Sequence, residues 1–141
     1  MKFYLTQKVL FKHCDPAGIV FYPRYFEMIN DSVETFFDEV LGYPYETMHA
    51  TNGVPTVQIS TSFEAASRHG DTLEIAVVPT RIGGASLDMS IIATCAGETR
   101  FTANLTLVYV RKDMGTERWP DELRAIISSH IQSESMEAAN G

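Results

Sequence analysis

The sequence predicts an α+β domain in which one antiparallel sheet curls around one long helix. Three observations support this fold. A long amphipathic segment follows a first strand-like segment, four alternating segments come after it, and the links between those four are short. A chain of 141 residues has the length of a single domain and can bury a sizeable core. With 45% hydrophobic and 21% charged residues, the composition is that of an ordinary globular protein.

The long helix is expected from Pro23 to Leu41. Proline suits the first helical position because its φ is fixed and it has no N–H to leave unpaired. Gly42 is a typical residue just beyond a helix end. Apolar residues recur at spacings of three and four and predict the face packed in the core: Tyr22, Phe26, Ile29, Val33, Phe36, Phe37 and Val40.

A first strand is expected over residues 2–12, where aromatic and branched side chains are frequent. Alternation of apolar and polar residues predicts four more strands, packed on one face only: 56–65, 72–82, 85–95 and 99–111. The links between them contain glycine and have turn chemistry. We therefore expect these four strands to form a meander, in the order β–α–β–β–β–β.

A short last helix is expected from Pro120 to Gln132. The small polar residues that follow predict a disordered tail over 133–141, so that the domain occupies 1–132.

The net charge of −7 argues against a nucleic-acid partner, which would select a basic face. A phosphate-bearing ligand would need a local cluster of cations. The candidates for such a cluster, each of which has the alternative of being a solvated surface charge, are Arg68, His69, Arg81, Arg111 and Lys112.

No apolar run approaches the ~20 residues of a membrane span, and the N-terminus has no apolar signal region. Cys14 and Cys95 lie far apart without metal-site spacing, which predicts reduced thiols. These features predict a cytoplasmic protein without a membrane partner. The four histidines show no metal-ligand spacing, so no metal is expected.

The segment from Phe11 to Phe26 combines the features of a reaction centre. Asp15 stands in a turn with Pro16 and Gly18, and an ordinary aspartate is ionised at neutral pH. Its carboxylate can attack a thioester or deprotonate water. The alternative is that Asp15 only supports the turn through an Asx-type bond.

The helix after this turn begins without a polar cap, because neither Phe21 nor Tyr22 has the short side chain that usually occupies a free N–H. The first backbone donors can then receive a substrate oxygen, unless water or a loop caps them. His13 lies two residues before Asp15 and either contacts substrate or is a structural histidine.

The run from Asp15 to Tyr25, Asp-Pro-Ala-Gly-Ile-Val-Phe-Tyr-Pro-Arg-Tyr, resembles the motif of the hotdog-fold acyl-CoA thioesterases of the 4-hydroxybenzoyl-CoA thioesterase family. The strand order is also that of the hotdog fold, over roughly residues 2–115. The resemblance implies hydrolysis of an acyl-CoA to a carboxylate and free CoA, without a separate cofactor. It implies Asp15 as nucleophile or general base, and the Tyr22 backbone N–H as the group that polarises the thioester carbonyl.

The resemblance further implies a substrate-binding set and a homodimer or homotetramer with active sites between subunits. The set consists of His13, Gly18, Asn30, Val54, Pro55 and Thr56. Two positions depart from the family pattern. Asn30 replaces an Asp near the substrate's ring hydroxyl, and Gly83-Gly84-Ala85 replaces an Arg-Arg-Lys cluster that contacts the CoA nucleotide. Both concern substrate recognition, so the acyl group stays open between aromatic and short-to-medium chains.

Two other functions fit the same scaffold: an acyl-carrier-protein thioesterase and a non-catalytic acyl-CoA binding module. A hydratase is disfavoured, because no His/Glu or Asp/His dyad of that type is present.

Overall fold

The computed structural model describes the backbone of residues 2–140 and the side chains of residues 2–131. Its helices are η1 (Phe11–His13), α1 (Pro23–Glu39), α2 (Tyr45–Met48) and α3 (Asp121–Asn140). Its strands are β1 (Phe3–Lys8), β2 (Asn52–Gly53), β3 (Thr56–Phe63), β4 (Thr72–Ile82), β5 (Ser86–Cys95), β6 (Glu98–Val108) and β7 (Val110–Arg111). Among the described residues, no helix combines the length and apolar character needed to cross a membrane.

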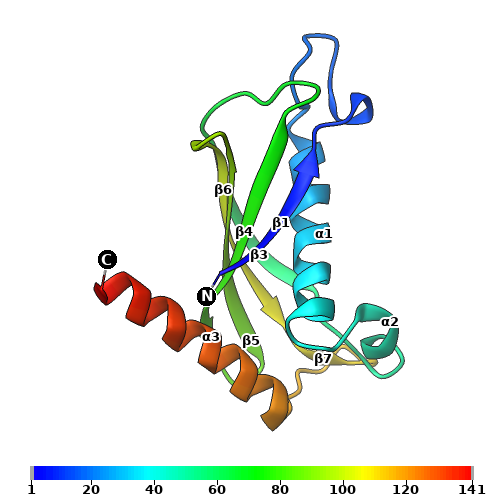
Figure 1. The fold of residues 1–141 in the computed structure, drawn as a ribbon. Coiled ribbons are helices and arrows are strands. Elements are labelled where there is room, and N and C mark those ends of the chain that lie inside the picture. The colour runs from blue at the N-terminus through cyan, green and yellow to red at the C-terminus, as the bar shows by residue number, and fades with distance from the viewer. Residues whose placement is uncertain (1, 141) are drawn as a thin grey trace.

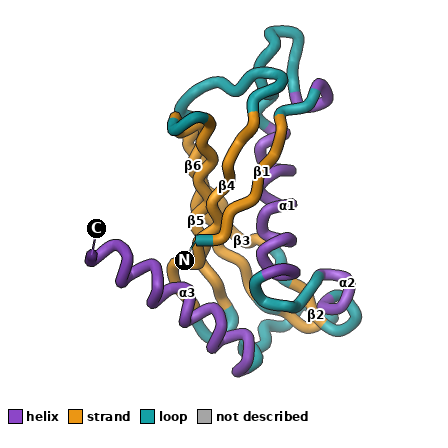
Figure 2. Tube along the Cα trace, in the orientation of Figure 1, coloured by secondary structure: helices purple, strands orange, loops and turns teal. Residues whose placement is uncertain are grey.

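Five strands form one antiparallel sheet in the order β1-β4-β5-β6-β3, and α1 lies along one face of it (Figure 1). The sheet curves beside the helix (Figure 2). This arrangement confirms the predicted α+β fold, with a five-stranded antiparallel sheet, a long helix and a C-terminal helix. A second, two-stranded sheet pairs β2 with β7, and neither this sheet nor the short helices η1 and α2 were predicted.

The predicted meander is wrong for β3. This strand pairs with β6 at one edge of the sheet, whereas β1 pairs with β4 at the other, so only β4, β5 and β6 form a meander. The physical reason lies in residues 64–71, which are too many for a tight hairpin and instead cross from one edge of the sheet toward the other. Because β1 already occupies the free edge of β4, β3 takes the free edge of β6.

The crossover is held by the guanidinium of Arg100 on β6. Its Nη1 donates to the Ala66 carbonyl at 3.1 Å, to Ser67 Oγ at 3.2 Å and to Asp71 Oδ2 at 2.7 Å. The Arg68 N–H also donates to Asp71 Oδ2 at 2.9 Å. The Arg68 N–H and Arg100 together hold the pKa of Asp71 below its usual range. One side chain thus fixes both ends of the crossover.

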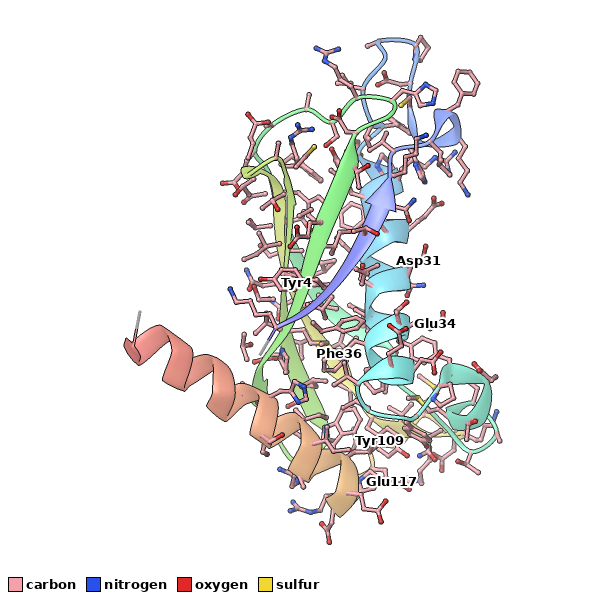
Figure 3. All side chains as sticks on the ribbon, in the orientation of Figure 1. Tyr4, Asp31, Glu34, Phe36, Tyr109 and Glu117 are labelled. Atoms are coloured by element: carbon pink, nitrogen blue, oxygen red, sulfur yellow. The ribbon has the colours of Figure 1, made fainter. Side chains whose placement is uncertain are left out.

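The core face of α1 contains the predicted Ile29, Val33, Phe36 and Phe37, and it differs from the prediction toward the start of the helix. Tyr25, Met28 and Ser32 are buried, whereas Tyr22 is 57% exposed. Ser32 is accommodated because its hydroxyl donates to the Met28 carbonyl at 2.6 Å. Figure 3 shows Asp31 and Glu34 on the side of α1 away from the sheet and Phe36 on the side toward it. Tyr22 is exposed because it precedes the first helical residue, and its ring lies 5.8 Å from that of Phe63 on the edge strand.

The predicted burial of β3 is also wrong for its apolar residues. Val57 is 60% exposed, Ile59 39% and Phe63 47%. The cause is that β3 is an edge strand with a neighbouring strand on one side only. An exposed apolar edge strand is a surface on which another chain can pair.

Helix α3 begins one residue after the predicted Pro120 and continues to Asn140, past the predicted end at Gln132. Leu123 and Ile127 are buried in the core. The side chains of 132–140 and all of Gly141 lie outside the described residues. The division into a domain over 1–132 and a disordered tail over 133–141 therefore stays a prediction. Cys14 and Cys95 are both free, as predicted.

Candidate active site

The motif around Asp15 folds into a tight hairpin. The Phe21 N–H donates to the His13 carbonyl at 2.9 Å, Cys14 pairs with Val20, and the Asp15 N–H donates to the Ile19 carbonyl at 3.0 Å. The turn closes through the Gly18 N–H, which donates to the Asp15 carbonyl at 2.9 Å. Gly18 has a φ of +82°, a conformation that side chains disfavour. The hairpin extends beyond the start of α1 (Figure 1) and carries Asp15 next to its turn.

The Asp15 carboxylate has one oxygen engaged and one free. Oδ1 accepts a hydrogen bond from the Ala17 N–H at 2.9 Å, which is the Asx-type bond of a turn. Oδ2 accepts no hydrogen bond from the described residues, and the residue is half-buried. Asp15 therefore supports the turn and still presents an oxygen for chemistry.

The start of α1 leaves one backbone donor unpaired. Tyr22 occupies the cap position without a side-chain hydrogen bond. The Arg24 N–H donates to the Phe21 carbonyl at 2.9 Å, and the Tyr25 N–H to the Tyr22 carbonyl at 3.0 Å. The Tyr22 N–H donates to no atom of the described residues. Of the backbone donors predicted to be free, only the Tyr22 N–H is available among the described residues. The N–H groups of Arg24 and Tyr25 are used by the first turn.

Tyr22 lines a cavity of about 460 Å³ at the beginning of α1, here called the helix-start cavity. Its walls come from two segments, residues 19–25 and residues 63–66. The Phe63 ring lies 5.8 Å from the rings of both Tyr22 and Tyr25. Asp15 does not line this cavity. Its backbone pairs with that of Ile19, which is a lining residue. The predicted catalytic carboxylate and oxyanion donor therefore belong to neighbouring parts of one loop.

A second cavity of about 530 Å³, here called the mid-helix cavity, lies further along α1. Four of the predicted substrate-binding residues line it, namely Asn30, Val54, Pro55 and Thr56. The sequence interpretation missed the contributions of α2, of the loop after it and of β2, together with a methionine after β7. These are Tyr45, His49, Asn52 and Met114. No local pattern marks these residues, since the cavity draws on five separate segments.

The polar groups of the mid-helix cavity are held by defined partners. Asn52 Nδ2 donates to the Val110 carbonyl at 3.1 Å and to Glu117 Oε2 at 3.0 Å. Burial and the nearby Glu34 carboxylate raise the pKa of Tyr45 to about 12, so its hydroxyl is neutral at pH 7. His49 Nδ1 lies 2.8 Å from the Tyr45 carbonyl, which fixes the orientation of its ring.

His13 and Gly18 line neither cavity. His13 is buried, and its Nδ1 accepts a hydrogen bond from the Leu10 N–H at 2.9 Å. Burial, together with the charge of Lys12, lowers the pKa of His13 below the usual 6.5. A neutral, buried histidine that accepts a backbone hydrogen bond fits the structural alternative. Contact of His13 or Gly18 with substrate stays a prediction.

The candidate phosphate-binding cations are divided between three places. Arg111 and Lys112 line the mid-helix cavity. Arg68 pairs with Ile19 beside the hairpin, and His69 follows it. Arg81 lies on β4 and lines neither cavity. Among the described residues, no group of three or more His, Cys, Asp or Glu side chains is placed to hold a metal ion.

The family model of the thioesterase-like superfamily matches residues 9–127 of this chain. This range includes the hairpin, α1 and the whole sheet except β1. No curated protein matches the sequence.

Solved structures of two thioesterases and of a CoA-bound protein are similar to this chain over most of its length. The 1,4-dihydroxy-2-naphthoyl-CoA thioesterase of Synechocystis has a TM-score of 0.83 at 16% identity, covering 91% of this chain and 96% of that one. For a gentisyl-coenzyme A thioesterase the TM-score is 0.79 at 24% identity, with coverages of 86% and 98%. For a Staphylococcus aureus protein in complex with CoA it is 0.88 at 15% identity, with coverages of 94% and 85%. These likenesses establish the predicted hotdog fold.

Proposed function

This chain belongs to the thioesterase-like superfamily and is a thioester hydrolase, and we propose that its substrate is an acyl-CoA. The products are a carboxylate and free CoA. The reaction needs no separate cofactor, because CoA is part of the substrate. We further propose that the protein acts in the cytoplasm.

The observation that carries this proposal is the pair of unused groups beside the helix-start cavity. The Tyr22 N–H is unpaired among the described residues, and Asp15, which keeps Oδ2 free, pairs with Ile19 three positions before Tyr22 in the hairpin. A backbone donor at the positive end of a helix stabilises the oxyanion that forms when a thioester carbonyl is attacked. A carboxylate supplies the attacking oxygen or activates the attacking water.

Two routes fit these groups. In the first, an Asp15 oxygen attacks the acyl carbon and the C–S bond breaks, releasing CoA thiolate and leaving a mixed anhydride that water cleaves. In the second, Asp15 takes a proton from water, whose oxygen attacks the acyl carbon directly. After a single turnover in ¹⁸O-water, an unlabelled product acid establishes the first route, since it requires transfer of an Asp15 oxygen and leaves the label in Asp15.

We propose that the complete site forms between two copies of the chain. Strand β3 runs from the mid-helix cavity, which Thr56 and Ile59 line, to the helix-start cavity, which Phe63 lines. If two copies pair through their exposed β3 edges in antiparallel fashion, two-fold symmetry puts the start of one β3 against the end of the other. The helix-start cavity of one subunit then adjoins the mid-helix cavity of its partner. Further association into a homotetramer is part of the same proposal.

The mid-helix cavity is proposed to receive the acyl group. Apolar side chains of α1 and β3 suit an aromatic ring or a short-to-medium chain, and the Asn30 amide can hydrogen-bond a ring hydroxyl. Two of the similar solved structures are of thioesterases named for dihydroxylated aromatic acyl-CoAs. A 4-hydroxybenzoyl-like group is therefore the first substrate to test, against benzoyl-CoA and straight-chain acyl-CoAs ranked by kcat/KM.

The decisive variant is Asp15→Asn. The amide oxygen of Asn can still accept the Ala17 hydrogen bond, so the turn is retained while the negative charge is lost. We expect kcat to fall by at least about 100-fold with unchanged thermal stability. Asp15→Ala, which also loses the turn bond, is the matched comparison. Hydrolysis by Asp15→Asn at a rate near that of the wild type would contradict the proposed role.

Two alternatives are tested by the same assay. An acyl-carrier-protein thioesterase would show a higher kcat/KM for the carrier-bound acyl group than for the acyl-CoA. A non-catalytic acyl-CoA binding module would bind the ligand saturably and release no thiol.

A further inference from the structure

An exposed aromatic ring beside the Asp15 hairpin has basic residues next to it in its own turn and in the turn that it contacts. The side chain of Phe11 is 79% exposed, more than any other large hydrophobic residue described. Its ring centroid lies 6.0 Å from that of His69, at an interplanar angle of 54°. Lys12 and Arg68 are exposed next to these two residues in the chain. We refer to Phe11, Lys12, Arg68 and His69 as the Phe11 patch.

The backbone holds the two halves of the Phe11 patch together. The Val9 N–H donates to the Asp71 carbonyl at 2.7 Å, and the Gly70 N–H donates to the Val9 carbonyl at 2.9 Å. Residue 9 is therefore adjacent to residues 70–71. The turn after residue 9, which contains Phe11 and Lys12, lies beside the turn before residue 70, which contains Arg68 and His69. Buried His13 anchors the first turn through the Leu10 N–H. Phe11 is thus exposed on a fixed turn.

The patch is positively charged in a chain whose net charge is −7. Two acidic side chains lie within three residues of the patch along the chain: Asp71 is paired with the Arg68 N–H and with Arg100, and Asp15 has Oδ1 engaged by the Ala17 N–H. The Arg68 and Lys12 side chains form no ion pair with the described residues. Such a local cluster attracts an anion that the molecule as a whole would repel.

The patch lies close to the proposed reaction centre. Arg68 pairs with Ile19, and Ile19 pairs with Asp15, so that Arg68 and Asp15 are two strand spacings apart. Two spacings amount to about 10 Å. The long pantetheine arm of CoA separates its nucleotide from its sulphur by a distance of this order or more. A thioester at Asp15 can therefore have its nucleotide on this patch.

We propose that the Phe11 patch binds the adenine nucleotide of CoA, with the Phe11 ring stacked on adenine and Lys12 and Arg68 paired with the phosphates. The proposal rests on the proposed function and assigns the CoA site that Gly83-Gly84-Ala85 lacks the charge to form. Bases stack on exposed aromatic rings regardless of their hydrogen-bonding pattern, and cations pair with phosphate oxygens.

Of the two cations at the mid-helix cavity, Arg111 fits a nucleotide less well. Arg111 is already engaged, since its Nη1 donates to the Thr116 carbonyl at 3.0 Å and its Nε lies 3.4 Å from Asp113 Oδ1. Met114 is the exposed apolar side chain there, and no exposed aromatic ring adjoins it among the described residues.

The first test needs no catalysis. Adenosine 3′,5′-bisphosphate is titrated into wild-type protein, Phe11→Ala, Arg68→Ala, and two controls at the opposite end of β1, Tyr4→Ala and Lys2→Ala. Tyr4 is 49% exposed and matches Phe11 as a surface aromatic (Figure 3). We expect Phe11→Ala to weaken binding about tenfold and Arg68→Ala about threefold to fivefold. The controls should bind like the wild type.

The second test compares an acyl-CoA with the same acyl group on pantetheine, which lacks the nucleotide. Phe11→Ala should raise KM for the acyl-CoA about tenfold and leave kcat/KM for the acyl-pantetheine unchanged. An equal effect on both substrates, or on neither, would overturn the proposal. So would a changed oligomeric state in Phe11→Ala, or a loss confined to carrier-protein substrates, because the patch would then contact a protein. Absence of hydrolysis in the wild type contradicts the proposed function alone, since the titration still tests the patch.

Discussion

The two cavities at the ends of β3 differ in how the chain builds them. Residues 19–25 and 63–66 alone line the helix-start cavity, and backbone hydrogen bonds fix the hairpin beside it. The mid-helix cavity draws residues from five segments between Phe26 and Met114. The first cavity adjoins a carboxylate and an unpaired N–H, whereas the second contains apolar side chains, amides and two cations.

This difference fits two separate roles, the reaction at the hairpin and acyl recognition in the mid-helix cavity. Groups that react must be held in a fixed geometry, and a short hairpin next to a helix start provides it through local backbone bonds. Groups that recognise an acyl chain must surround it, and a surrounding wall needs several segments. In this proposal the reaction is a property of the hairpin and specificity a property of the mid-helix cavity. Predictions that separate the two cavities therefore test the division.

The largest effect is expected from separating the subunits. Val57→Lys places a charge on the exposed apolar face of β3, where Val57 is 60% exposed and lines neither cavity. We expect a dimer that dissociates at low concentration, with kcat/KM reduced by about 100-fold, because catalytic groups and acyl cavity are then on different molecules. Sedimentation and activity are measured over the same concentration range. Gln58→Lys, on the neighbouring exposed position of the same strand, is the charge-matched control. A monomeric Val57→Lys with full activity would place the whole site in one chain.

The second prediction asks whether the two cavities act together across subunits. Asp15→Asn inactivates the hairpin, and Asn30→Trp fills the mid-helix cavity, so each homodimer should be inactive. Mixing and reassociating the two variants should restore about a quarter of wild-type activity, because half of the dimers are mixed and each has one intact site of two. Lack of any recovery, despite mixed dimers seen by mass spectrometry, would show that each site uses one chain.

The third prediction concerns the crossover that carries one wall of the helix-start cavity. Arg100→Met removes the guanidinium bonds to Ala66, Ser67 and Asp71 from a side chain that is only 12% exposed. We expect the free energy of unfolding in urea to fall by about 2 kcal/mol. Arg81→Met, on an exposed position of β4, should change it by less than about 0.5 kcal/mol. Equal stability of both variants would mean that the backbone alone holds the crossover.

The smallest effect is a pH dependence of stability from His13. Burial lowers its pKa below 6.5, so the folded state disfavours its protonation. The unfolded chain then binds more protons, and the stabilisation present above pH 6.5 is lost as the pH falls through the lowered pKa. Urea unfolding between pH 7.5 and pH 5 measures this slope. His13→Asn keeps an acceptor for the Leu10 N–H and should show a shallower slope. An unchanged slope would assign the effect to other groups.

The sequence predicted the features that depend on neighbouring residues. Pro23 and Gly42 marked the helix, alternation marked the strands, and Asp15 with Gly18 marked a turn, all of which the structure contains. It failed where distant segments compete. The position of β3 depended on which edge of the sheet β1 had already taken, and the exposure of Val57 and Phe63 followed from that edge position.

The same division applies to the site. Asp15, the uncapped Tyr22 and the resemblance of the motif could be read from one stretch of sequence, because a hairpin and a helix start are made by local backbone bonds. Only the tertiary structure decided that Asn30, Val54, Pro55 and Thr56 share a cavity with His49 and Met114, and that Phe11 lies against His69. Those neighbours are set by strand pairing and by the crossover, whose energies depend on contacts far apart in the chain.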